Sequence, residues 1–230
     1  MLLRRVRLRL VLAASLSAVL AESAHAQTDR FETPAFRGTA GALFAGWDDF
    51  ASATGANAPD VGGSAPGGFA FTQLDPAAFV TSSGNLYSFS TVLSHRIDVT
   101  GLLATPGLVI LQTRTVGGAL DPASVTLETF DGSVWSTLAA PAIDLLFSGA
   151  TGSPGFGSAL DEARRYTWTL GSSVVATSLR LAFSAAGTSQ SFQAASLDLA
   201  PASPIPEPAA AAVLAGLGAV ACATLRRPRR

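Results

Sequence analysis

The sequence predicts an all-β fold, a β-sandwich or jelly roll of eight to ten short strands. Strict alternation of apolar and polar residues in the last third of the chain is typical of strands with one buried face. The continuous apolar run 108–111 is typical of a central strand buried on both faces. Asp131-Gly132, between two apolar segments, is the strongest short hairpin pattern in the chain. Abundant Gly, Ser, Thr and Ala with sparse charge also favour short strands and many turns.

The first half of residues 27–203 begins with an irregular lead-in, 27–41. Residues 43–50 form a first apolar segment, either a strand or a short helix, and 51–68 is dense in turn residues and predicts a flexible loop. Strands are then expected at 68–73, 86–92, 95–99 and 108–111.

In the second half, 123–130 is expected to pair with 134–139 across Asp131-Gly132. Residues 143–147 add a short element before a second turn-rich loop, 148–160. Three half-buried strands follow, each with one face exposed to solvent. Their apolar faces are Tyr166, Trp168 and Leu170; Leu179, Leu181 and Phe183; and Ala195, Leu197 and Leu199.

The first 26 residues have the pattern of a secretory signal peptide. Four arginines precede an apolar stretch of about twelve residues, 10–21, and Ala24-His25-Ala26 provides small residues at the expected cleavage positions. We expect export through the Sec translocon and cleavage by signal peptidase after Ala26. Residues 27–203 would then form the exported domain.

The last 27 residues, 204–230, predict handling at a membrane. Pro206-Glu207-Pro208 forms a rigid extended hinge, because proline fixes φ and lacks an N–H. The uncharged segment 209–225 would form about 25 Å of helix, at the low end of what spans a bilayer. Four arginines after it are expected on the cytoplasmic side; they are Arg226, Arg227, Arg229 and Arg230. The alternatives are a plain uncleaved anchor and, less well matched, a lipid-anchor signal.

At these residues the chain resembles the PEP-CTERM family of exported bacterial proteins. In that family a Pro-Glu-Pro motif, a membrane helix and an Arg-rich end are recognised by an exosortase. The resemblance implies an exosortase-like membrane transpeptidase as partner, a Gram-negative host and a setting of exopolysaccharide production. It also implies a precursor anchored in the inner membrane and a product in the envelope or outside the cell. Trp47–Phe50, 82–89 and Leu120-Asp121 resemble stretches common in the exported domains of this family, but they imply no activity.

The exported domain is acidic and has no sulfur chemistry. Residues 27–203 contain seven Arg, no Lys and fourteen Asp plus Glu, a formal net charge of −7. Such a domain repels phosphate backbones, so nucleic-acid binding is not expected. Cys222, the single cysteine, lies in the tail, so the domain has no disulfide and depends on its hydrophobic core.

No catalytic residue is expected. His95 is the one histidine of the exported domain, and the chain has no Gly-x-Ser-x-Gly motif, so a serine triad is not indicated. One histidine without cysteine makes a zinc site improbable. We therefore expect neither a metal nor another cofactor, and we expect His95 to be structural.

The carboxylates leave two alternatives open. Ca²⁺ needs only carboxylates and carbonyls, but no Asp-x-Asp-x-Asp loop unites the acids, so exposed turn carboxylates are expected. A carboxylate pair for glycoside hydrolysis depends on a three-dimensional separation. The acids concerned are Asp48, Asp49, Asp60, Asp121, Asp131, Asp161, Glu162 and Asp198.

Three functions follow from these patterns. The leading hypothesis is a non-enzymatic envelope or extracellular-matrix protein sorted through its C-terminal Pro-Glu-Pro motif. The first alternative is a carbohydrate-binding β-sandwich, with exopolysaccharide as a partner and Trp135, just past the Asp131-Gly132 turn, as the best candidate for stacking on a sugar. Trp168 is expected in the core, and Trp47 fits either role. The second alternative is a secreted glycoside hydrolase with a carboxylate pair.

Overall fold

The computed structural model describes residues 29–62, 68–153 and 157–202. The predicted signal peptide with Ala24 and Ala26, the Pro206–Pro208 motif, the membrane helix 209–225 and the terminal arginines lie outside the described residues. Within the described residues, no helix has the length and apolar character needed to cross a membrane.

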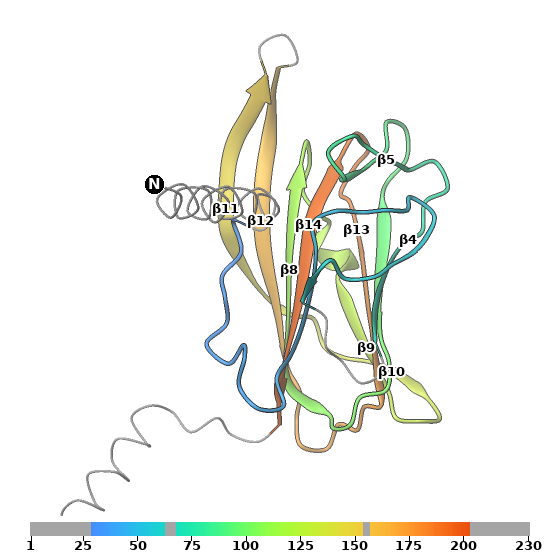
Figure 1. The fold of residues 1–230 in the computed structure, drawn as a ribbon, viewed down its shortest axis with the longest axis vertical. Helices are drawn as coiled ribbons and strands as arrows, with labels where there is room; N and C mark the ends of the chain where they lie inside the picture. Colours follow the sequence, from blue (N-terminus) through green and yellow to red (C-terminus); the bar gives the residue numbers. More distant parts are fainter. Residues whose placement is uncertain (1–28, 63–67, 154–156, 203–230) are drawn as a thin grey trace, which may run out of the picture.

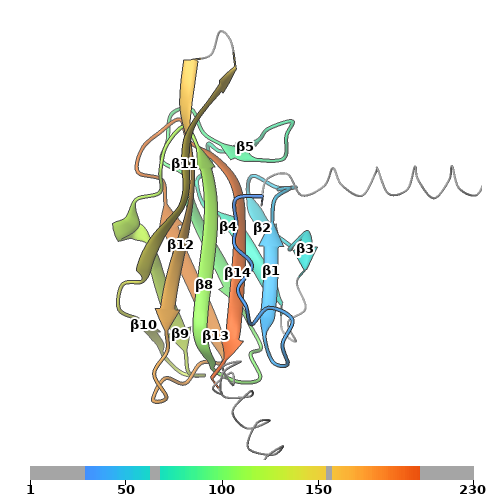
Figure 2. The ribbon, with the colours of Figure 1, turned by 90° about the vertical axis from the view of Figure 1, so that its left-hand side faces the viewer.

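The described chain is all-β and forms two antiparallel sheets, consistent with a β-sandwich (Figures 1 and 2). Sheet A has the order β11-β12-β8-β14-β1-β3, and β6 pairs with both β14 and β5. Sheet B has the order β10-β9-β13-β7-β4-β2. The strands of sheet A are β1 (Leu43–Trp47), β3 (Val61–Gly62), β5 (Phe79–Val80), β6 (Leu86–Tyr87), β8 (Pro106–Val116), β11 (Ala142–Ser153), β12 (Gly157–Thr169) and β14 (Ser191–Pro201). Those of sheet B are β2 (Gly55–Asn57), β4 (Phe69–Gln73), β7 (Ser94–Val99), β9 (Thr126–Phe130), β10 (Trp135–Thr137) and β13 (Ser178–Ser184).

The core lies between the sheets and follows the predicted alternation. Every second residue of β13 is buried, as are Tyr166, Trp168 and Leu170 at the end of β12. These side chains form one cluster with the apolar faces of β4, β7, β8 and β14. Burying a large apolar side chain stabilises a fold by roughly 1.5–3 kcal/mol, so this one cluster explains a compact body without disulfides.

Two further predictions are confirmed by the pairing. β8 lies between β12 and β14, and Val109, Ile110 and Leu111 are all buried, as expected for a central strand. β9 pairs with β10 from Phe130 and Trp135 onward, so the hairpin turns at Asp131-Gly132. Gly132 has φ of 109°, a conformation that residues with a Cβ rarely adopt.

The prediction of a turn-rich loop at 148–160 is wrong. β11 and β12 pair along almost their whole length, from Ala142 opposite Thr167 to Ser153 opposite Gly157. This stretch contains Gly, Ser, Ala and Thr and lacks a clear apolar alternation. A β-ladder is made by backbone hydrogen bonds. The pairing therefore continues into a stretch whose amino-acid composition is typical of a loop.

The last predicted strand has no solvated face. Ser196 and Asp198 of β14, expected to face solvent, are 2% and 0% exposed. The irregular lead-in, as residues 29–42, covers this outer face of sheet A. Arg37 donates to both carboxylate oxygens of Asp198 at 2.7 Å, and Phe36 packs on Ile110 and Ala200. Contacts 161 residues apart in sequence cannot be inferred from local alternation.

The remaining differences concern short elements. The segment 43–50 contains a strand, β1 (Leu43–Trp47), and no helix. The predicted loop 51–68 contains the short strands β2 and β3 within its described part. Strand pairing in the predicted 86–92 stops at Tyr87, and 123–130 begins as a 3₁₀ turn, η1 (Pro122–Ser124), because Asp121 caps it and proline occupies its first position.

Candidate functional site

A concave region with both polar and apolar walls lies where two connections cross between the sheets. The linker 138–141 leads from β10 in sheet B to β11 in sheet A, and the loop 170–177 leads from β12 back to β13. A cavity of about 450 Å³ lies between them. β11 begins at Ala142, opposite Thr167. The last two residues of β12, Trp168 and Thr169, therefore extend past the start of β11 and border the cavity.

A second cavity of about 300 Å³ adjoins the first and shares Leu138, Ser173 and Val174 with it. We call the two together the end cleft. Its polar lining comes from both sheets and from the 170–177 loop: Thr129, Asp131, Ser136, Thr167, Thr169 and Ser173. Aliphatic side chains lie beside these hydroxyls, a combination that suits a neutral ligand with several hydroxyl groups.

Trp168 forms part of the wall of the larger cavity. It is 4% exposed, so the prediction that it belongs to the core is confirmed. Its indole Nε1–H has no hydrogen-bond partner among the described residues. A buried donor without an acceptor costs roughly 1–3 kcal/mol, and this nitrogen exposes almost no surface, so a ligand in the cleft does not reach it.

Asp131 is the one carboxylate that lines the end cleft. Its Oδ1 accepts from the Val134 N–H at 2.9 Å, from the Ser133 hydroxyl at 2.8 Å and from the Ser133 N–H at 2.7 Å. These bonds lower the pKa of Asp131, with the Val134 bond the largest cause. The carboxylate is therefore ionised at neutral pH and is positioned by the hairpin turn.

Trp135, the predicted sugar-stacking residue, lines neither cavity of the end cleft. It is 36% exposed and lies against Phe130, with ring centroids 5.1 Å apart. The guanidinium of Arg180 lies over its ring at 4.3 Å. A sugar stacking on that ring face would have to displace Arg180. Trp47, by contrast, is fully buried and donates its indole N–H to the Asn57 carbonyl at 3.1 Å.

The adjacent carboxylates Asp161 and Glu162 do not converge. Successive residues of β12 point to opposite faces of sheet A. Asp161 pairs with Arg114 at 2.9 Å and Glu162 with Arg164 at 2.7 Å. This arrangement does not provide two neighbouring acids for glycoside hydrolysis.

The expectation of exposed turn carboxylates is wrong for Asp48, Asp161, Glu162 and Asp198, which are 0–7% exposed. Asp60 accepts from the backbone N–H groups of Asp48 and Asp49 across the first loop. Asp121 caps the 3₁₀ turn, and Asp198 is the buried partner of Arg37. In the described part of the chain, no three His, Cys, Asp or Glu side chains gather in a way that could hold a metal ion.

His95 lies deep in the core and is 1% exposed. Its ring contacts Phe71, Phe183 and Phe192 at centroid distances of 4.4–5.4 Å. Neither ring nitrogen has a hydrogen-bond partner among the described residues, and burial lowers its pKa from 6.5 to about 3, with Asp75 opposing the shift. This environment holds the imidazole neutral and away from solvent.

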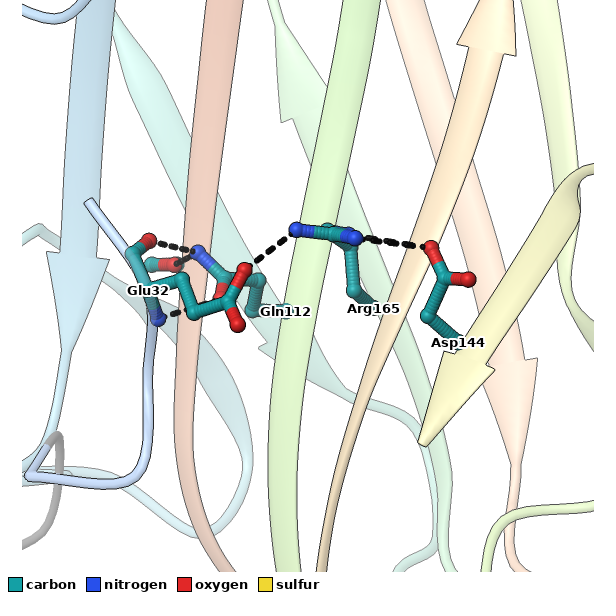
Figure 3. Close-up of polar contacts among 5 residues, drawn as sticks. Glu32, Gln112, Asp144 and Arg165 are labelled. Carbon is teal, nitrogen blue, oxygen red and sulfur yellow. Dashed lines mark hydrogen bonds and ion pairs between the residues drawn. The ribbon is translucent and has the colours of Figure 1, made fainter. Parts of the chain in front are cut away.

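Each of the seven arginines in the described residues lies within ion-pair distance of a carboxylate. Figure 3 shows one such chain of contacts on sheet A: Asp144 binds Arg165, Arg165 binds Glu32 and the Glu32 backbone binds Gln112. The pairs of Arg165 with Glu32 and of Arg37 with Asp198 attach the lead-in to sheet A. They also reduce the positive charge available to an acidic ligand.

Comparisons with known proteins add no relative, because no protein-family model and no curated protein matches the chain.

The sequence could not have revealed the end cleft. Its walls come from two connections about 30 residues apart whose Ala, Gly and Ser residues are typical of any surface loop.

Proposed function

We propose that this chain is a non-enzymatic exported protein of the cell envelope or extracellular matrix, sorted through its C-terminal Pro-Glu-Pro motif by an exosortase-like transpeptidase. The order of elements in the tail carries the proposal: Pro206-Glu207-Pro208, then an uncharged segment, then four arginines. The last strand, β14, ends at Pro201, so the motif follows the folded body after only four residues.

In this proposal the chain supplies the substrate peptide and its partner supplies the chemistry. Segment 209–225 halts translocation and holds the hinge at the outer face of the inner membrane. The prolines keep the hinge extended, so binding in a protease cleft costs little ordering entropy. Glu207 is the only charged residue between Asp198 and Arg226 and is therefore the recognition handle.

Glu207→Gln tests this role in the native host. The change removes the charge and keeps the shape of the side chain, so we expect the uncleaved precursor to accumulate in the membrane fraction. Glu128→Gln, on a strand of sheet B, is the matched control and should be processed like the wild type. Equal processing of all three proteins would refute recognition through Glu207.

A second candidate function, carbohydrate binding, is favoured by the end cleft. The cleft combines several hydroxyl groups and aliphatic side chains, and Asp131 is the only carboxylate in its lining. The net charge of −7 on residues 27–203 disfavours acidic polymers. We therefore propose a neutral polysaccharide segment as the ligand.

Binding to a panel of neutral polysaccharides tests this candidate. Ser173→Ala removes an exposed hydroxyl of the cleft, and we expect about a tenfold weaker Kd if it makes one good hydrogen bond. Trp135→Ala separates the two candidate surfaces, because Trp135 does not line the cleft. Loss of binding on Trp135→Ala alone would move the site from the cleft to the surface around Trp135. An absence of saturable binding would rule the candidate out.

A further inference from the structure

The β11–β12 hairpin continues beyond the rest of sheet A as a two-stranded arm. β8 pairs with β12 only between Thr169 and Asp161. The β11–β12 ladder runs on to Ser153 opposite Gly157. We call 149–153 and 157–160 the arm; Figures 1 and 2 show it projecting past the neighbouring strands. A single backbone bond, from the Gly117 N–H to the Leu160 carbonyl, ties its base to the end of β8.

An arm of this kind needs a partner. An isolated two-stranded ribbon is at best marginally stable in water. The arm has no third strand and few large side chains, since Ala150, Thr151 and Gly152 are small and exposed. Its main means of gaining stability is another strand at one of its open edges.

β11 presents such an edge over an unusual length. It has 12 residues, and in the described structure β12 is its only strand partner. Strands at sheet edges are commonly protected by proline, lysine or bulges. β11 contains neither proline nor lysine, and its one irregularity lies between Leu145 and Phe147, before the arm. Arg30 of the lead-in lies over the Phe147 ring at 4.1 Å, so the unprotected template for strand addition is 148–153.

The charges of the molecule indicate what can approach this edge. Asp144 is the only charged residue of β11, and it is paired with Arg165. The stretch 147–153 is uncharged, whereas residues 27–203 together carry −7. Two copies of this chain repel each other through most of their surface. Glu162 and Asp161 of β12 lie opposite Ser148 and Gly149, but they are paired with Arg164 and Arg114, so repulsion at this edge is weaker than elsewhere.

We propose that the β11 edge pairs antiparallel with β11 of a second copy, so that two A sheets form one continuous sheet across a two-fold axis. Each copy offers an edge of the same length and neutrality. A two-fold contact is self-complementary, so one pairing completes both arms and closes the assembly at two chains. The proposal concerns assembly and does not depend on the sorting or carbohydrate proposals.

Cysteine cross-linking tests the geometry in the full chain, produced in an exporting bacterium. A Cys222→Ser background leaves no other thiol. Single cysteines are placed at 148, 149, 150, 151 and 152, with Leu103→Cys, in the loop at the opposite end of β8, as the control. Antiparallel pairing brings only the residue nearest the two-fold axis within disulfide range of its own copy. We expect one sharp maximum of disulfide-linked dimer; uniform cross-linking, or none above the control, overturns the proposal.

A charge test on the full chain in mild detergent complements the cross-linking. Ser148→Lys with Ala150→Lys places two lysines on one exposed face of β11, and we expect the dimer measured by sedimentation velocity to become monomeric. Leu103→Lys with Ala104→Lys adds the same charge elsewhere and should remain dimeric. A monomeric wild type would contradict β11 pairing. A dimer that survives both pairs of substitutions would also contradict it and would indicate association through another region, such as the tail. The thermal midpoints of the variants serve to confirm that they are folded.

Discussion

At the scale of single residues, His95 shows how a buried titratable group makes stability depend on pH without acting as a site. Its imidazole lies among three phenylalanine rings, and both nitrogens lack partners in the described structure. Beside it in the ladder is Gln73, whose side-chain amide is also unpartnered there. His95 and Gln73 thus place unpartnered polar groups inside an apolar cluster, and each unsatisfied group lowers the free energy of unfolding.

His95 therefore predicts a specific acid sensitivity. Its folded pKa is about 3, below the unfolded value of 6.5, so the unfolded chain binds the proton more readily. The contribution of His95 to the free energy of unfolding is complete above pH 6.5. As the pH falls toward 3, the free energy of unfolding decreases by up to about 1.4 kcal/mol per pH unit. Unfolding by urea at several pH values, in the wild type and in His95→Phe, measures it.

We expect the His95→Phe curve to be flatter between pH 6.5 and 3 than that of the wild type. His95→Leu is a second variant, in case the larger ring overpacks the cluster. The other ionisable groups are the same in all three proteins, so the difference between the curves isolates His95. Parallel curves would show that the imidazole is not buried and neutral in the folded protein.

At the scale of elements, the lead-in 29–42 acts as an extra layer on sheet A. Asp198 is fully buried beneath it, and burial raises the pKa of this carboxyl even though the Arg37 hydrogen bond and charge oppose the shift. Arg37 also lies over the Phe44 ring at 3.7 Å. The pair thus links the lead-in to β14 and β1.

Removing one member of the Arg37–Asp198 ion pair is expected to lower the free energy of unfolding substantially. Arg37→Ala leaves a buried carboxylate without its partner, and removing one member of a buried pair typically costs about 3–5 kcal/mol. Arg37→Met combined with Asp198→Leu removes both charges and should lose much less stability, because no charge then remains buried. Chemical denaturation of the two variants distinguishes these cases. Equal losses would mean that packing, and not the charge, decides the stability here.

Elements also show where prediction from sequence succeeds and fails. The strands around Leu111, Trp168 and Leu181 were predictable because each has a side-chain pattern matched to its faces. The arm was not, because its Gly and Ser residues look like a loop while backbone hydrogen bonds extend the ladder. The burial of Asp198 was also hidden, because the covering segment lies 161 residues away in sequence.

At the scale of the whole molecule, the described body and the tail have separate roles in our account. The body holds its arginines in ion pairs and its single histidine in the core, and it presents an end cleft and an open β11 edge. The end cleft is tertiary in origin, since neither of its two connections has a distinctive sequence. The tail, by contrast, is suggested entirely by local sequence, through Glu207 between two prolines.

The intact mass of the protein recovered from its native host, with its terminal peptides, tests the central proposal most directly. We predict an N-terminus at Gln27 and a C-terminus near Pro206–Pro208, without the segment 209–230. That result would identify a product that has been exported, cleaved at the motif and then released or transferred. A mass that still includes 209–230 would contradict sorting by cleavage and would identify the chain as a tail-anchored protein.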